Sequence, residues 1–520
     1  MKKLLMIMLI CTLALAARAQ GYEIKVKINH LKPGDEIILG HHFNERLIPD
    51  DTIKLNANGS GLFKGSKKLP GGMYFLFMPN KSYFDIIIDN VQNFSIENDT
   101  TDYLKNIVVT GSVENTVFVE YQRFMLNQQE KYTVIAEKQK TAKESNDSKT
   151  VNECTAQIDQ LNKDLNDHYL SIKKQYPDLF FTKFLTATRD IEVPASITDP
   201  DKQYLYYKQH FFDNFEVSDP RLLRTVIYQP KIERYIDKVV VQMPDSLIKE
   251  CKWLVNQSRS SDELFRFMLI YLFNKYAKSE TIASENVYVS LAEIYVKDAV
   301  WDTDSFKIQL DKKIAKKKNC LIGNTAKEIT MQRLPGDSVR IEALRPYLET
   351  LKEKGVELEK QKPDFEARRS DVVKILDNFV NQFDGYIKLS QIKAKYTVLW
   401  FMEPDCSHCK KETPEFYKFY LDTLQKYDVA VLCIYMNKSV DKFADLYRHI
   451  GKWFDFVESN HFYGWYNIWN PFDQYRENYD ISSSPVLYLL DEKKEILAKR
   501  IDYHQVYELV DYIAKHPEIK

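Results

Sequence analysis

The sequence is poor in cysteine, with seven among 520 residues, and only one closely spaced pair occurs. Exported domains that depend on disulfides are much denser in cysteine, so the sequence excludes a disulfide scaffold. The chain also lacks an excess of charge of either sign, because 73 Lys and Arg residues face 74 Asp and Glu residues. Nothing in the overall charge therefore indicates binding to nucleic acid or to an anionic membrane.

Long apolar runs are absent after residue 19, so we expect no later segment to span a bilayer. The start is typical of a secretory signal peptide: a short basic stretch, the apolar run 4–16 and a small-x-small cleavage site at 17–19. An N-terminal membrane anchor is the alternative, although a spanning helix needs roughly 20 apolar residues. We therefore expect residues 1–19 to be removed and the exported chain to begin at Gln20.

Residues 21–112 contain short β-favouring stretches that are separated by turn signals such as Asn56-Ala-Asn-Gly59. The first stretch alternates strictly between apolar and polar residues, which is typical of a half-buried strand. Several short strands at this spacing predict a small all-β sandwich domain. The expected strands are 22–28, 36–39, 73–78, 83–88, 94–97 and 108–111.

Residues 113–319 are expected to form a helical middle domain that serves as a scaffold or partner surface. Segment 117–138 is one helix candidate, and the segment 158–172 repeats apolar residues every three or four positions. These two segments predict a pair of long antiparallel helices. The lysine-rich segment 312–318 is expected to be a solvated helix face.

The paired cysteines are Cys406 and Cys409, which follow the apolar run 398–401 and open a helix-like segment that extends to residue 426. Residues three apart in a first helical turn lie on one face, so the two sulfurs are placed to close a small disulfide. Cys406 would lie at the helix N-terminus, where free N–H groups and the dipole stabilise a thiolate. Because the thiolate is the attacking species, Cys406 is the expected nucleophile and Cys409 the resolving thiol.

Ser407 and His408 lie between the two cysteines. A protonated His408 would stabilise the neighbouring thiolate, and a solvated side chain without a role is the alternative. A zinc site needs two further ligands, and the sequence has no second cysteine pair. Haem attachment needs a His directly after Cys409, where Lys410 stands. We therefore expect a redox dithiol with no metal and no organic cofactor.

The other cysteines do not form such a pair. Cys433 lies in an apolar run, and Cys154 and Cys251 lie in helical patterns, so we expect all three to be buried as small apolar residues. The sequence indicates no function for Cys320.

From residue 320 onward, the chain resembles the thioredoxin fold, and within it the TlpA-like thiol–disulfide oxidoreductases of the cell envelope. Pro414 matches the proline that kinks the active-site helix of thioredoxins, and Pro485 in Ile481-Ser-Ser-Ser-Pro485 matches their cis-proline. The resemblance implies an α/β thioredoxin-like domain at 320–520, in which Ser407, His408 and Pro485 modulate the dithiol.

The chain departs from the thioredoxin pattern at three places. Asp405 replaces the usual Trp before the first cysteine, and Ser407-His408 replaces Gly-Pro or a similar pair. Trp400 stands where thioredoxins keep a buried acid, so a proton acceptor for the resolving thiol is missing.

The expected order of elements includes a first strand at 328–333 and a helical insertion at about 338–383 before the catalytic core. For the aromatic segment 461–471 there are two expectations: it borders the substrate groove, or it packs in the core. The N-terminal β-domain resembles the one that precedes many envelope thioredoxin-like proteins. The core elements are expected as strand 397–401, helix 409–426, strand 429–435, helix 440–451, strand 454–457, helix 471–478, strands 486–490 and 495–500, and helix 504–515.

These patterns predict an exported, periplasmic thiol–disulfide oxidoreductase that exchanges disulfides with envelope proteins and with a membrane redox partner. The TlpA-like resemblance favours reduction, whereas the Cys-x-His-Cys pattern is similar to that of disulfide isomerases and periplasmic oxidants. The alternative function is a non-enzymatic envelope binding or scaffold protein that carries the thioredoxin fold as a module.

Overall fold

The computed structural model describes residues 21–279, 284–436, 442–471 and 474–516. The predicted signal peptide, 1–19, lies outside the described residues. The chain divides into two compact units, residues 1–270 and 271–520, and the boundary falls within helix α9 (Asp262–Ala277). Within the described ranges, no helix has the length and apolar character needed to cross a membrane.

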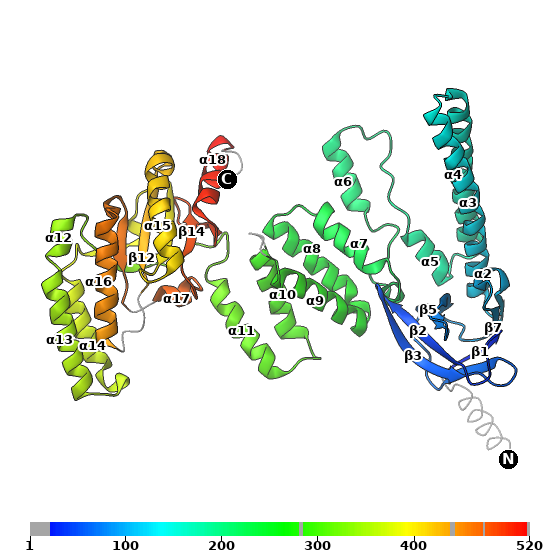
Figure 1. The fold of residues 1–520 in the computed structure, drawn as a ribbon, viewed down its shortest axis with the longest axis horizontal. Coiled ribbons are helices and arrows are strands. Elements are labelled where there is room, and N and C mark those ends of the chain that lie inside the picture. Colours follow the sequence, from blue (N-terminus) through cyan, green and yellow to red (C-terminus); the bar gives the residue numbers. More distant parts are fainter. Residues whose placement is uncertain (1–20, 280–283, 437–441, 472–473, 517–520) are drawn as a thin grey trace, which may run out of the picture. The chain divides into compact units, whose positions relative to one another are not determined.

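The first unit begins with two four-stranded sheets in the orders β4-β1-β7-β8 and β3-β2-β5-β6 (Figure 1). Ile24 and Val26 from one sheet share a buried core with Leu39 and Tyr74 from the other, which confirms the predicted sandwich. The strands are β1 Tyr22–Asn29, β2 Glu36–Phe43, β3 Arg46–Lys54, β4 Ser60–Gly65, β5 Gly72–Phe77, β6 Tyr83–Ile88, β7 Asn93–Asp99 and β8 Val108–Thr110.

Strands β3 and β4 were not predicted. The side chains of β3 are exposed or half-buried throughout, so the strand lacks the apolar alternation that marks a buried face. It also contains Pro49, which normally argues against a strand. β3 lies at the end of its sheet, paired with β2 alone, and an edge strand tolerates a proline.

Helices follow the sandwich, as predicted for the middle of the chain. The long antiparallel pair is confirmed, since α3 and α4 pack along one another (Figure 1). The helices up to the unit boundary are α2 Tyr103–Asn106, α3 Val113–Glu144, α4 Ser148–Gln175, α5 Phe180–Ala187, α6 Pro200–His210, α7 Tyr228–Arg234, α8 Pro244–Gln257 and α9.

The second unit is built around a seven-stranded sheet in the order β10-β9-β13-β12-β11-β14-β15. Successive residues of β11 point into two different cores: Trp400 and Met402 into one, Leu399 and Phe401 into the other. The sheet is therefore covered on both faces, as an α/β fold requires. The strands are β9 Thr330–Arg333, β10 Tyr386–Lys388, β11 Tyr396–Met402, β12 Val429–Tyr435, β13 Tyr466–Trp469, β14 Val486–Leu490 and β15 Ile496–Lys499.

Most predicted elements of this unit are present, and its helices cover the sheet. Three of the helices, α12 to α14, lie between β9 and β10, where the insertion was predicted. The helices are α10 Ser284–Asp298, α11 Asp304–Lys318, α12 Ser338–Glu342, α13 Arg345–Gln361, α14 Phe365–Val380, α15 Ser407–Phe419, α16 Phe443–Ser459, α17 Gln474–Asn478 and α18 Tyr503–Lys515.

The predicted strand 454–457 is wrong, because these residues belong to helix α16. Ile450, Trp453 and Val457 are buried at a spacing of three and four, which is the period of a helix face. The strand that takes its place in the sheet is β13, within the predicted aromatic segment. Asn467 interrupts the apolar run there, and its side-chain NH₂ group donates to the carbonyl oxygen of Phe462 over 2.7 Å.

Helices α10 and α11 are bound to the sheet by ion pairs that are partly buried. Lys317 donates to Glu285 over 2.5 Å and to Asp480 over 3.1 Å, so the expectation of a fully solvated lysine face is wrong at this residue. Lys499 of β15 also pairs with Glu285, and its ammonium donates to the Cys320 sulfur at 3.6 Å. The compact second unit therefore includes part of the predicted helical domain.

Candidate active site: a dithiol at the start of α15

Cys406 lies at the N-cap of α15, directly after the loop that leaves β11. Its backbone is extended, with φ −71° and ψ 126°, and its N–H donates to the carbonyl oxygen of Glu403 over 3.2 Å. Its own carbonyl oxygen accepts from the N–H of Lys410 over 3.0 Å and so opens the helix. The thiol thus lies beside the unpaired N–H groups of the first helical turn.

The two cysteines differ in exposure. Cys406 is half-buried, Cys409 is 0% exposed, and both are free thiols. The Cys406 thiol donates a hydrogen bond to the carbonyl oxygen of Ser484 over 3.4 Å. The Ser484–Pro485 peptide bond is cis, as the family resemblance implied. The fold therefore brings the dithiol and Pro485 together, although they are far apart in the sequence.

The surroundings of the two thiols shift their pKa values in opposite directions. Burial acts to raise the pKa of Cys406, but hydrogen bonds from the Cys409 backbone and thiol, from the Ser484 side chain and from the His408 backbone lower it below the usual value. Burial raises the pKa of Cys409 to about 12. Near neutral pH, Cys406 is the thiol that more readily becomes a thiolate.

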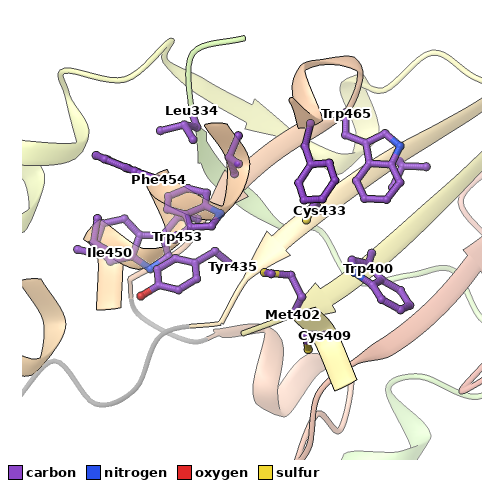
Figure 2. Packing of buried hydrophobic residues seen from close by; sticks show 14 of the residues in the cluster. Leu334, Trp400, Met402, Cys409, Cys433, Tyr435, Ile450, Trp453, Phe454 and Trp465 are labelled. Atoms are coloured by element: carbon purple, nitrogen blue, oxygen red, sulfur yellow. The ribbon is translucent and has the colours of Figure 1, made fainter. Parts of the chain in front are cut away.

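The surroundings of Cys409 are largely apolar (Figure 2). Trp400, which stands where thioredoxins keep an acid, donates its indole N–H to the Thr413 hydroxyl over 3.1 Å. Cys433 is 1% exposed and lies in the same core cluster. Cys154 and Cys251 are also buried, as predicted. The indole at position 400 cannot accept a proton. Trp400 therefore cannot deprotonate Cys409, and another group has to accept that proton.

The side chains of Ser407 and His408 are exposed. Among the described residues, no hydrogen bond or ion pair of the His408 ring is found, whereas its backbone N–H is one of the groups that lower the pKa of Cys406. The site that the fold assembles therefore consists of Cys406, Cys409 and the segment around Pro485, with Ser407 and His408 at its surface.

A second group of side chains lies beside Cys406, and of these only Asp405 was singled out in the sequence. Asp405 accepts a hydrogen bond from Lys452 over 2.8 Å, and its other carboxylate oxygen lies 3.3 Å from His449 Nε2. His449 Nδ1 in turn lies 2.7 Å from the Tyr435 hydroxyl. His449 and Lys452 share one face of α16, but no pattern in the sequence indicates that this face meets the loop before Cys406.

The aromatic segment before the cis-proline packs in the core. Phe462, Trp465 and Trp469 are at most 2% exposed, and Trp465 contacts Phe416 and Tyr417 of the active-site helix. Phe462 also contacts Tyr417, so Phe462 and Trp465 pack against α15, whereas Trp469 contacts Tyr435 of β12. Within the described ranges, no group of three or more His, Cys, Asp or Glu side chains is arranged to hold a metal ion.

Family comparisons divide the chain into three parts. Residues 22–118 match a domain of unknown function (DUF4369), residues 135–318 match a second domain of unknown function (DUF5106), and residues 358–499 match the AhpC/TSA family. The AhpC/TSA match includes both cysteines of the dithiol and the cis-proline. A search of curated proteins found no match.

Solved structures that resemble the chain include a thioredoxin-like protein from Bacteroides caccae ATCC 43185. It is 16% identical, with a TM-score of 0.40, over 62% of this chain and 98% of that chain. A domain of a possible thiol-disulfide isomerase from Cytophaga hutchinsonii ATCC 33406 is 23% identical, with a TM-score of 0.26, over 38% and 97%. The thioredoxin domain of a thiol-disulfide oxidoreductase from Bacteroides vulgatus is 19% identical, with a TM-score of 0.24, over 37% and 96%.

Proposed function

Since the C-terminal part of the chain is a thioredoxin-like oxidoreductase domain of the AhpC/TSA family, we propose that its dithiol, Cys406 and Cys409, exchanges disulfides with proteins of the cell envelope. The Cys406 thiolate attacks one sulfur of a substrate disulfide, a mixed disulfide forms, and the other substrate sulfur leaves as a thiolate that takes up a proton. Cys409 then loses its proton and attacks Cys406. The second substrate thiol leaves, and two electrons have passed from the dithiol to the substrate.

The observation that carries this proposal is the contrast between the two sulfurs. Cys406 is half-buried, and hydrogen bonds lower its pKa, whereas Cys409 is buried and burial raises its pKa to about 12. An accessible, acidic thiol next to a buried, protonated one is the arrangement expected for a nucleophile and a resolving group. In this assignment, Ser407, His408 and Pro485 modulate the dithiol and do not react.

Location and direction are further parts of the proposal. The signal-like start at residues 1–19 supports export to the periplasm or cell envelope. We propose that the dithiol reduces its substrates and is itself reduced by a membrane-bound redox partner. Trp400, in place of an acid, and His408, between the two cysteines, would each act on the rate and the potential of the dithiol.

Trapping tests the assignment of the two cysteines. A Cys409→Ala variant of the mature chain retains the nucleophile and cannot resolve, so it should accumulate mixed disulfides that run as reducible bands on non-reducing gels. Mass spectrometry of these bands would identify the substrates. The Cys406→Ala variant is the matched control and should trap nothing. Equal trapping by both variants would contradict the assignment of the nucleophile.

The reduction potential tests the direction. We expect equilibration against glutathione buffers to place the dithiol nearer to the roughly −270 mV of thioredoxin than to the roughly −120 mV of a strong periplasmic oxidant. A potential close to the oxidant would reverse the proposed direction. A purified chain that neither reduces insulin nor equilibrates with glutathione would favour the non-enzymatic envelope scaffold.

A further inference from the structure

A chain of polar contacts connects the core of the second unit to the residue before the nucleophile. Tyr435, at the end of β12, is fully buried and stacks on Trp453 with 4.6 Å between ring centroids. Its hydroxyl lies 2.7 Å from His449 Nδ1, and His449 Nε2 lies 3.3 Å from Asp405 Oδ2. The second oxygen of Asp405 accepts from Lys452 over 2.8 Å. The contacts thus extend from the core to the residue next to Cys406.

We propose that Asp405 is a positioning residue that tunes the acidity of Cys406 and the potential of the dithiol, and that Lys452, which compensates its charge, and His449, which faces its second oxygen, set the strength of this effect. The proposal rests on the proposed function, because it takes Cys406 as the nucleophile. The charged side chain of Asp405 stands directly before the nucleophile, at the position where the family pattern has an uncharged Trp.

The sign of the effect follows from electrostatics. A carboxylate one residue from Cys406 repels the thiolate and would raise its pKa if it stood alone. Lys452 faces one oxygen of that carboxylate and offsets its charge, and His449 Nε2 faces the other oxygen. Removing the carboxylate should therefore favour the thiolate, and removing a compensating group should disfavour it. A more stable thiolate stabilises the reduced dithiol, so the potential becomes less negative.

The two groups that face Asp405 differ in their exposure. The Lys452 side chain is 47% exposed, whereas that of His449 is 5% exposed. Salt and water screen an exposed pair much more than a buried one, so the contribution of Lys452 should be small and salt-dependent. When Tyr435 donates to Nδ1 of His449, the ring hydrogen is on Nε2 and faces Asp405. The contact of His449 should then be nearly independent of salt.

The test is a double-mutant cycle on the mature chain, with Asp405→Asn, Lys452→Gln and the double variant. Two quantities are measured: the pH dependence of iodoacetamide labelling of Cys406 and the redox equilibrium with glutathione. Asp405→Asn should lower the labelling pKa and shift the equilibrium towards the reduced protein by about threefold or more, which is about 14 mV for a two-electron couple. Lys452→Gln should shift both quantities in the opposite direction, and less so in about 1 M salt.

The double variant separates a tuning role from a merely structural one. If Lys452 acts through Asp405, Lys452→Gln should have little effect in the Asp405→Asn background. Equal shifts of one sign in both single variants, or an unchanged equilibrium in Asp405→Asn, would overturn the inference. A wild-type chain that does not equilibrate with glutathione would instead overturn the proposed function, so the two failures are distinguishable.

Discussion

The Cys406 sulfur lies 3.4 Å from the carbonyl oxygen of Ser484, the residue that forms the cis peptide bond with Pro485. The same sulfur also receives hydrogen bonds from the backbone of the first turn of α15. The Cys406 sulfur is therefore held between the start of α15 and the segment that leads into β14, and it is half-buried, whereas Cys409 is buried.

The first prediction concerns the order of alkylation. In the reduced protein, iodoacetamide should modify Cys406 before Cys409 at every pH below about 9, because only a thiolate reacts and the pKa of Cys409 is raised to about 12. The labelling rate at Cys406 should rise with pH through its lowered pKa and then level off. Peptide mass spectrometry at successive pH values measures both, and earlier labelling of Cys409 would contradict the assignment.

The second prediction concerns His408. His408→Pro should raise the pKa of Cys406 and make the potential more negative by tens of millivolts, since about 30 mV corresponds to a tenfold change in equilibrium. Proline removes both the imidazole and a backbone N–H that lowers this pKa, and it is tolerated in the first helical turn. His408→Ala retains the N–H and is the matched variant. Glutathione equilibration of both variants separates the two contributions, and an unchanged potential in both would leave His408 as a solvated residue without a role.

The third prediction concerns the boundary of the redox domain. A fragment of residues 320–520 contains every strand of the sheet, but it lacks Glu285, the partner of Lys499, whose side chain is 5% exposed. Leaving a buried charge without its partner costs about 3–5 kcal/mol. We therefore expect the fragment 271–520 to be more resistant to urea than 320–520. Equal resistance of the two fragments would show that α10 and α11 add nothing to the stability of the sheet.

The ion pair between Glu285 and Lys499 also predicts that the free energy of unfolding depends on pH. Burial acts to raise the pKa of Glu285, but Lys499 and Lys317 lower it overall. The stabilisation is therefore complete above the usual pKa of a glutamate and is lost as the pH falls through the lowered value. Glu285→Gln should remove it. The control is Glu293→Gln on the same helix, which pairs with an exposed Lys318 and should change the free energy of unfolding by less than about 1 kcal/mol.

The fourth prediction concerns two helical glycines. A Cβ at Gly355 of α13 would lie 2.1 Å from Phe443 of α16, so Gly355→Ala should destabilise the protein by about 1–3 kcal/mol. Gly451 of α16 has room for a Cβ, at 3.9 Å from Leu348, so Gly451→Ala should stabilise by up to about 1 kcal/mol. Urea unfolding of both variants measures the difference. A stabilising Gly355→Ala would show that α13 and α16 can move apart.

The local pattern was sufficient for elements whose burial matches their spacing. The strand predicted at 429–435 is β12, and every residue of 397–401 lies in β11, because both runs are apolar apart from Thr397 and lie between two cores. Segment 454–457 was mistaken for a strand, because four residues are too few to distinguish a helix face from a strand. The edge strand β3 was missed, because its side chains bury little surface.

The sequence by itself determined the dithiol and its helix, because residues three apart in one helical turn meet whatever the rest of the chain does. It also pointed to Pro485 through a resemblance, without placing it beside Cys406. Only the tertiary structure decided which distant groups surround the thiol: Ser484, His449 and Lys452 come from other elements of the sheet and its helices. Such contacts depend on how helices pack on a sheet, and the spacing of residues within one segment carries no information about the charges of another.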